Sequence, residues 1–484
     1  LDGWTGVESI GESFLQNCTS LEILIIAGWT KITAIPNNFL SGCEKLEALD
    51  LGGWTNVETI GDNFLSGCIN LALLVFINLT KITEVPDNFL KGCESLVYAN
   101  LNGWKNVDTI GNNFFSGCQL LETLELEDWT KIREVKDNFL EDCETMESID
   151  LTGFSSLETI GAGFLKGCSG LTDEGLDLSP LVNVTEIGDY FLSECTGLTE
   201  LDLTPQPEAE KGLLSLQTIG ENFLNGCSNL ETLHLDNLTG LTEIPAFFCK
   251  DLTSLTELTC EGLLVTEIKD NFLDGCTGLI NLDLSALSKV TTLGEKFLTN
   301  CSSLETLDMS GWAELTAFPE DFLKDETNVA LKELTLSGLD AITEIPDSFL
   351  SGCINLETLY FENNTNLTSI APNFCENLTH LESLSFNGCV NINTLESNFL
   401  KGCSIGLTEL SLCDLLGLTT IEENFLNGCN KLETLTIKDL PLLDTLPSKF
   451  CESLPALANL TFENLPALKK IPDNFLLNCT PGLV

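Results

Sequence analysis

Basic residues are scarce in this chain. Its 484 residues include 73 aspartates and glutamates against 22 lysines and arginines, which gives a formal net charge of −51, and Arg133 is the single arginine. Such a surface repels phosphate backbones and anionic lipid headgroups, so we expect neither nucleic acid binding nor direct membrane insertion. Cationic proteins, divalent metals and neutral glycans are compatible with this charge.

Histidine and long apolar runs are also rare. His234 and His380 are the two histidines, and the sequence has no G-x-S-x-G, H-E-x-x-H or phosphate-binding motif. We therefore predict a non-enzymatic protein with no catalytic residue, no cofactor and no metal site. No apolar run approaches the ~18 residues that a membrane-spanning helix needs.

The chain also lacks a visible signal peptide. It begins at Leu1, inside a repeat. We therefore expect a fragment of a longer chain, or a repeating unit of an assembly.

One phrase, I-(G/P)-x-N-F-L-x-G-C-x-x-L-E-x-L-x-L, recurs along the whole chain. Its phenylalanine appears nineteen times, and thirteen of the eighteen intervals are 25 residues. A fixed period of this length that contains L-x-x-L-x-L is typical of a leucine-rich-repeat solenoid, whose repeats bury their apolar faces against one another. The sequence therefore predicts a single α/β solenoid over residues 1–484, with about nineteen 25-residue units.

The repeat from Leu46 to Leu71 illustrates the predicted unit. Leu49 and Leu51 alternate with small or polar neighbours, which is the period-two pattern of a short strand. The segment around Phe64 is preceded by Asp and Asn, which cap helix N-termini, so we expect a short helix there. Stacking such units predicts a parallel concave sheet and short convex helices.

The repeated phrase, met in full from Ile219 to Leu235, resembles the BspA-like class of leucine-rich repeats found in surface proteins of bacteria and protists. That class typically has alanine before the phenylalanine, where this chain has asparagine, as at Asn38, Asn63 and Asn88. The resemblance implies a secreted or cell-surface protein used in adhesion or host contact. It carries no catalytic residues to transfer.

Cysteine is abundant, with 21 residues, and fifteen of them follow the phenylalanine by four positions. Where leucine takes that position, as at Leu252, a cysteine appears three residues earlier, as at Cys249. This exchange indicates a constant core volume, so we predict reduced, buried thiols. Stacked helices 8–10 Å apart would also be too distant for disulfides. Cys389 and Cys413 lie outside the columns and are the pair to check for a bridge.

The outward residue of each strand marks a candidate binding face. We predict that a protein or glycan partner, cationic in character, contacts a stripe of such residues on the concave sheet: Glu125, Asp150, Asp177, Asp202, His234 and Tyr360. Carboxylates on adjacent strands lie near 5 Å apart and repel one another unless a cation neutralises them. An ordinary solvated acidic face is the alternative, and the apolar zone of Leu73, Val75 and Ile77 is a competing site.

Asparagine sequons give a hypothesis about the compartment. If the protein is eukaryotic and secreted, we expect glycosylation at Asn78, Asn237 or Asn363, which share the loop after the strand. Asn459, which lies within a strand, is the least favoured of the sequons. Insertions into the repeat mark further positions of interest: Thr172–Glu174, Pro205–Gly212 and Lys324–Asn328.

Three functions follow from these patterns. The first is an extracellular or cell-surface adhesion solenoid that binds protein. The second is a structural subunit that self-associates head to tail, because neither end shows a polar capping repeat. The third is an intracellular scaffold, which the many free thiols favour.

Overall fold

The computed structural model describes residues 1, 3–320, 322–323, 329–345, 349–371, 374–375, 378–397, 399–400 and 402–479. The chain forms two compact units, Leu1–Leu241 with Phe247–Leu255, and Thr242–Ala246 with Thr256–Val484. Each unit consists of stacked coils joined by parallel strand pairs, which confirms the predicted parallel-sheet solenoid. One continuous solenoid over residues 1–484 stays a prediction, and the insertion at Lys324–Asn328 lies outside the described residues.

Unit 1 contains parallel strands of two lengths, which pair with strands of the same length in neighbouring coils. Its longer strands are β1 (Ile23–Ile25), β3 (Ala48–Asp50), β5 (Leu73–Val75), β7 (Tyr98–Asn100), β9 (Thr123–Glu125), β13 (Glu200–Asp202) and β15 (Thr232–His234). Its two-residue strands are β2 (Ala34–Ile35), β4 (Thr59–Ile60), β6 (Glu84–Val85), β8 (Thr109–Ile110), β10 (Glu134–Val135), β11 (Thr159–Ile160), β12 (Glu186–Ile187) and β14 (Thr218–Ile219). Three single-turn 3-10 helices accompany them, η1 (Thr152–Phe154), η2 (Asp173–Gly175) and η3 (Pro207–Ala209).

Unit 2 repeats this plan. Its longer strands are β17 (Glu257–Thr259), β19 (Asn281–Asp283), β21 (Thr306–Asp308), β22 (Glu333–Thr335), β24 (Thr358–Tyr360), β26 (Ser383–Ser385), β28 (Glu409–Cys413), β30 (Thr434–Lys438) and β31 (Asn459–Glu463). Its two-residue strands are β16 (Glu243–Ile244), β18 (Glu267–Ile268), β20 (Thr292–Leu293), β23 (Glu344–Ile345), β25 (Ser369–Ile370), β27 (Thr394–Leu395) and β29 (Thr420–Ile421).

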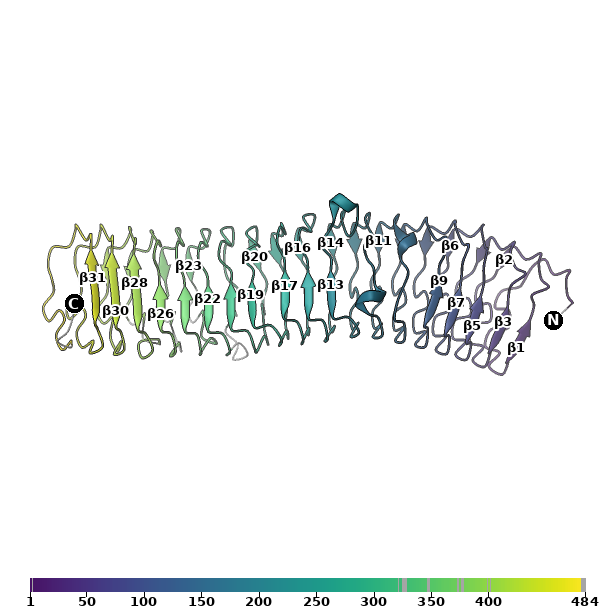
Figure 1. Ribbon diagram of the computed structural model, residues 1–484, viewed down its shortest axis with the longest axis horizontal. Helices are drawn as coiled ribbons and strands as arrows, with labels where there is room; N and C mark the ends of the chain where they lie inside the picture. The colour runs from purple at the N-terminus through teal and green to yellow at the C-terminus, as the bar shows by residue number, and fades with distance from the viewer. Residues whose placement is uncertain are drawn as a thin grey trace. The chain divides into compact units, whose positions relative to one another are not determined.

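The longer strands pair in the register that the 25-residue period demands. Ile23 pairs with Ala48, and Ile25 pairs with Asp50, so equivalent positions of neighbouring coils stack (Figure 1). The central residue of β1, β3 and β5 is buried and its two neighbours face solvent. The alternation in the sequence predicted this burial because side chains on a strand point to opposite faces. The ladder of two-residue strands was not predicted.

The prediction of a short helix in each repeat was wrong. In the described residues, turns take the place of these helices. The segment from Asn63 to Gly67 forms turns in which every second residue has positive φ: 61° at Asn63, 55° at Leu65 and 73° at Gly67. Their backbone amides bond to neighbouring coils on both sides, Asn63 to Asp87 O at 2.9 Å and Leu65 to Phe39 O at 3.0 Å. A helix would have closed these bonds within the segment.

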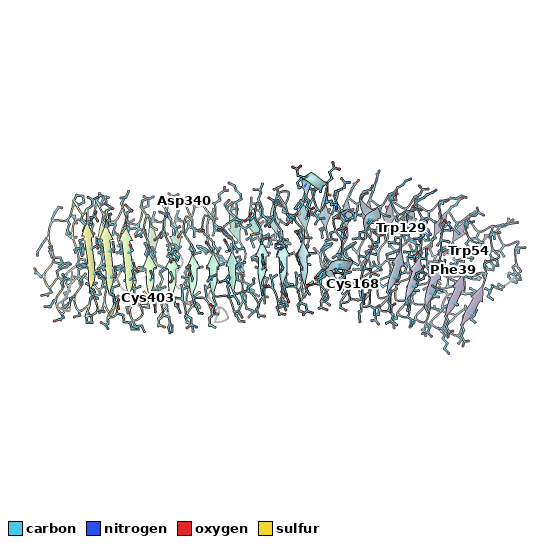
Figure 2. All side chains as sticks on the ribbon, in the orientation of Figure 1. Phe39, Trp54, Trp129, Cys168, Asp340 and Cys403 are labelled. Carbon is cyan, nitrogen blue, oxygen red and sulfur yellow. The ribbon has the colours of Figure 1, made fainter. Side chains whose placement is uncertain are left out.

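Coil spacing gives the physical reason for this difference. Phenylalanine rings of successive coils stack with centroids 5.8 Å apart for Phe39 and Phe64 and 5.0 Å for Phe64 and Phe89. Packed helices need 8–10 Å between their axes. The phenylalanine turns of successive coils therefore lie too close together for each of them to be a helix. Trp54 fills the same core and meets the Phe39 ring edge-on, with 5.7 Å between the ring centroids. Both residues are labelled in Figure 2, near each other in the N-terminal part of the chain.

Asparagine and aspartate hold this turn by contacts between coils. The Asn63 side chain donates to Asn38 Oδ1 at 3.0 Å, Asn88 donates to Asn63 at 2.9 Å, and the ladder continues through Asn113 and Asn138. One position earlier, Asn37 Oδ1 accepts the backbone amide of Asp62 at 2.8 Å. The capping chemistry expected of these residues is present, but it satisfies the next coil instead of a helix.

The cysteine column is buried in this core. All 21 cysteines are free thiols, and all are buried except Cys18, Cys413 and Cys479, which are half-buried. The Cys68 thiol donates to Leu40 O at 3.2 Å, and the Cys93 thiol donates to Leu65 O at 3.2 Å, each one coil back. The prediction of burial is confirmed for the column cysteines except Cys18 and Cys479. The argument from helix spacing was wrong, because no helices separate the coils here.

Candidate functional site

The outward face of the longer strands in unit 1 carries the candidate site. The strand register aligns equivalent positions of neighbouring coils, so the outward side chains form rows that run from coil to coil. Three parts of the face differ in chemistry. They are an apolar zone on β1, β3 and β5, a hydrogen-bonded cluster on β7 and β9, and an acidic hollow at β13.

The apolar zone consists of Ile23, Ile25, Leu73 and Val75, with relative exposures of 63%, 54%, 50% and 38%. Together with Ala48 and Asp50 of the strand between them, they line a hollow of about 330 Å³. Ile77, which the sequence placed in this zone, follows the strand and is half-buried.

The cluster on β7 and β9 contains Glu125, the first residue of the predicted stripe. Tyr98 donates its hydroxyl to Glu125 Oε1 at 2.7 Å, and the Asn102 amide donates to Oε2 at 2.9 Å. The hydrogen bond to Glu125 raises the pKa of the Tyr98 hydroxyl. Glu125 is half-buried, and both of its carboxylate oxygens already accept hydrogen bonds from Tyr98 and Asn102. It therefore has less free hydrogen-bonding capacity for a partner than the sequence predicted.

The structure brings the next four predicted residues together in pairs. Ile149 bridges to Leu176, which makes the following residues, Asp150 and Asp177, neighbours on adjacent coils. Asp202 pairs with His234 in the register of β13 and β15. The three aspartates are exposed and His234 is half-buried.

An acidic hollow of about 290 Å³ lies between the coils of Asp177 and Asp202. Its lining combines carboxylates of Asp173, Asp177, Glu200 and Asp202 with a leucine floor and with Lys211. The Asp177 and Asp202 carboxylates each accept the amide two residues ahead, at 2.9 Å and 2.8 Å. These bonds hold one oxygen of each carboxylate in place.

Two of the three insertions, Thr172–Glu174 and Pro205–Gly212, meet at this hollow. Asp173, in η2, accepts the amides of Thr199 and Glu200 at 2.8 Å and 3.1 Å, and so takes the place of a strand pairing. The loop after β13 carries η3 and is tied back by the Gly212 amide, which donates to Ser179 O at 2.8 Å. The sequence shows both insertions, but they are far apart along the chain. It therefore could not predict that Asp173 and Lys211 line the same hollow.

Tyr360 lies in unit 2, whereas Asp150, Asp177 and Asp202 lie in unit 1. It lies on β24, is 41% exposed, and pairs with Thr335 and Ser385 of the neighbouring strands. Beyond it, Asn387 and Ser411 bond to one another at 2.9 Å. Its surroundings are hydroxylic, in agreement with the sequence.

The predicted glycan acceptors are accessible. Asn78, Asn237 and Asn363 are exposed, and each has φ near 60° in the turn after its strand. Asn459 lies within β31 and donates to Thr434 Oγ1 at 3.2 Å. Use of these sequons stays a prediction.

Within the described ranges, no group of three His, Cys, Asp or Glu side chains is placed to hold a metal ion. The same part of the chain contains no helix that is long and apolar enough to cross a membrane.

A solenoid of stacked parallel coils with this period is a leucine-rich-repeat protein. The family model for the BspA-type leucine-rich repeat region matches residues 4–97, 83–209 and 213–330. A further leucine-rich-repeat model matches residues 329–390. The chain belongs to the BspA-type leucine-rich-repeat family. Neither model describes an enzyme, and such repeats typically form protein-binding scaffolds.

Solved structures resemble the chain at low sequence identity. A leucine-rich repeat protein from Bacteroides ovatus is 17% identical over 77% of this chain and 80% of its own, with a TM-score of 0.42. A leucine rich cell surface protein from Faecalibacterium prausnitzii is 15% identical over 76% and 83%, with a TM-score of 0.33. A leucine-rich repeat protein from Eubacterium ventriosum is 15% identical over 74% and 83%, with a TM-score of 0.37. No curated protein matches the chain.

Proposed function

We propose that this protein is a non-enzymatic, cell-surface solenoid that binds a cationic protein partner through the acidic hollow of unit 1. The observation that carries the proposal is the hollow itself, in which two insertions surround Asp177 and Asp202. Inserted loops on a rigid scaffold are common carriers of binding function.

The charge of the hollow favours a basic partner. Its carboxylates lie on neighbouring coils, and repulsion between them falls when a cation binds. Backbone amides hold Asp177 and Asp202 in place, so binding orders few side chains. The net charge of −51 adds long-range attraction for a basic protein.

The cell-surface location is supported by family membership and by the exposed sequons. Antibody labelling of intact source cells tests it, since labelling that appears only after permeabilisation contradicts a surface location. The filament and the intracellular scaffold stay hypotheses that no contact in the described residues favours.

The binding test uses a fluorescein-labelled octaarginine peptide and fluorescence anisotropy. Asp177→Asn with Asp202→Asn should weaken binding about fivefold to tenfold at low salt, as expected for two exposed charges. The dependence of affinity on salt should also become shallower, because fewer screened contacts form.

Glu158→Gln with Glu186→Gln is the matched control, because it removes the same charge from exposed positions on the two-residue strand side of the same unit. At physiological ionic strength its affinity should stay within about twofold of the unmodified protein, because charges more than about 8 Å from the peptide are largely screened there. Equal losses in both double variants would show that net charge, and not the hollow, attracts the peptide.

A further inference from the structure

We propose that the apolar zone of β1, β3 and β5 is a socket for a single lysine side chain of a partner protein. This site shares no residue with the acidic hollow and does not depend on it. The hollow over these strands, about 330 Å³ in volume, is lined by Ile23, Leu24, Ile25, Ala48, Leu49, Asp50, Leu73 and Val75, so Asp50 is its one charged residue.

The strand register builds the socket as two rows of three residues. The first row is Ile23, Ala48 and Leu73, and the second is Ile25, Asp50 and Val75. In each row a bulky aliphatic side chain stands on both sides of a smaller central residue. Adjacent strands are about 4.8 Å apart, so the outer side chains flank a slot one strand wide. The methyl group of Ala48 forms the floor of this slot.

The walls suit an extended aliphatic chain. Ile23, Ile25 and Leu73 are each at least half exposed. Ile23 and Ile25 lie on β1 and Leu73 lies on β5, and all three line the same hollow over the β3 strand between them. Contiguous apolar patches on a protein surface mark interaction sites. Lysine carries a stem of four methylene groups that it buries along apolar surface while its ammonium group stays at a polar position.

Asp50 supplies that polar position at the centre of the second row. Its Oδ1 accepts the Gly52 amide at 2.9 Å, which restrains the carboxylate at the edge of the hollow that Asp50 lines. Oδ2 has no hydrogen-bond partner among the described residues. An ammonium group needs one such oxygen, whereas a guanidinium group binds carboxylates best through both. The geometry therefore favours lysine over arginine.

Charge also excludes a purely apolar occupant. An aliphatic side chain without a cation would cover Asp50 and leave its carboxylate desolvated and unpaired, which is unfavourable. The acidic chain, with 51 more negative than positive charges, attracts a basic partner to the face. Binding at this zone should therefore weaken as salt rises, because an exposed ion pair is screened.

The test is a methyl NMR titration of the full 52.7 kDa chain labelled at its isoleucine δ1 methyl groups. The probe is N-acetyl-lysine methylamide, compared with the corresponding arginine and norleucine amides. The Ile23 and Ile25 methyl resonances should shift in a saturable manner, with the lysine amide binding at least threefold more tightly than either analogue. Conservative exchanges of Ile23 and Ile25 to valine assign the two signals.

Two variants separate the walls from the charge. Asp50→Asn keeps an oxygen for the Gly52 amide and should weaken lysine binding about threefold to fivefold, the range for an exposed ion pair. Ala48→Leu fills the slot and should abolish the shifts without lowering the thermal midpoint, because residue 48 faces solvent.

Asp308→Asn is the matched control, since Asp308 has the same bond to the amide two residues ahead, at 2.8 Å, in unit 2. Four results would overturn the proposal: no shift at either methyl, equal binding of norleucine, tighter binding of arginine, or an equal loss in Asp308→Asn. Failure of the acidic hollow leaves these readouts unchanged, because no residue that lines the socket also lines the acidic hollow.

Discussion

At the scale of single residues, the cysteines show why a thiol recurs at one position of the coil. The Cys168 thiol donates to Leu140 O at 3.1 Å, and Leu140 has φ of 55°. A backbone carbonyl in this apolar core needs a donor, and the thiol supplies a weak one while it occupies the volume of a small hydrophobic group. Packing and hydrogen bonding therefore both favour cysteine here.

Burial gives these thiols a measurable dependence on pH. Desolvation raises the pKa of Cys168, Cys227 and Cys301 from the ordinary 9.0 to about 12. The unfolded chain then loses protons at lower pH than the folded chain. The protonated thiols therefore stabilise the folded state fully below pH 9. This contribution to the unfolding free energy is lost as pH rises toward 12, at up to about 1.4 kcal/mol per pH unit for each thiol.

Urea denaturation followed by tryptophan fluorescence should therefore give equal unfolding free energies at pH 7 and pH 8, and a lower value at pH 10. A free energy that stays constant from pH 8 to pH 10 would contradict the buried, protonated state of the column.

At the scale of structural elements, the turn after the two-residue strand replaces the expected helix. Its alternating left-handed residues direct backbone amides to the coils on both sides. Asparagine is well suited to this position because it tolerates positive φ and its side-chain amide both donates and accepts. The departure from the family pattern, asparagine in place of alanine, thus has a structural role in the ladder.

Asn88 provides a test of this ladder. Its side chain donates to Asn63 at 2.9 Å and accepts from Asn113 at 2.9 Å, and its φ is 58°. Asn88→Ala should lower the unfolding free energy by about 1–3 kcal/mol, since it adds backbone strain and removes two hydrogen bonds. Asn88→Gly removes the bonds without the strain and should cost less. Equal losses measured by urea denaturation would show that backbone conformation contributes nothing here.

At the scale of the whole molecule, exposed sequons connect the fold to the proposed location. Asn78, Asn237 and Asn363 lie at exposed turns beside the longer strands, where an attached glycan leaves the core intact. Expression through a eukaryotic secretory pathway should therefore add glycan mass that a peptide N-glycosidase removes.

Substitution identifies the sites. Asn78→Gln, Asn237→Gln and Asn363→Gln together should remove most of the added mass, whereas Asn459→Gln, on β31, should remove none. A secreted chain without glycan, or one modified chiefly at Asn459, would contradict this prediction and weaken the support for an extracellular location.

The acidic face could be predicted only in part from the sequence. The L-x-L pattern identified Asp150, Asp177 and Asp202 as outward, because alternation along a strand is a local property. It could not show that Glu125 bonds to Tyr98, since these residues are 27 apart and meet through the register. For the same reason it missed Asp173 and Lys211, which insertions place beside the same hollow.

The sequence by itself determined the period, the burial pattern and the leucine-rich-repeat architecture, because each follows from apolar spacing within one repeat. The tertiary structure decided what fills the rest of each coil. Phe64 and Phe89 stack at 5.0 Å, a distance that only the packed coils reveal, and at that spacing turns bonded between coils replace helices. The socket at Asp50 likewise exists because Ile23, Ala48 and Leu73, 25 residues apart along the chain, become neighbours when parallel strands align.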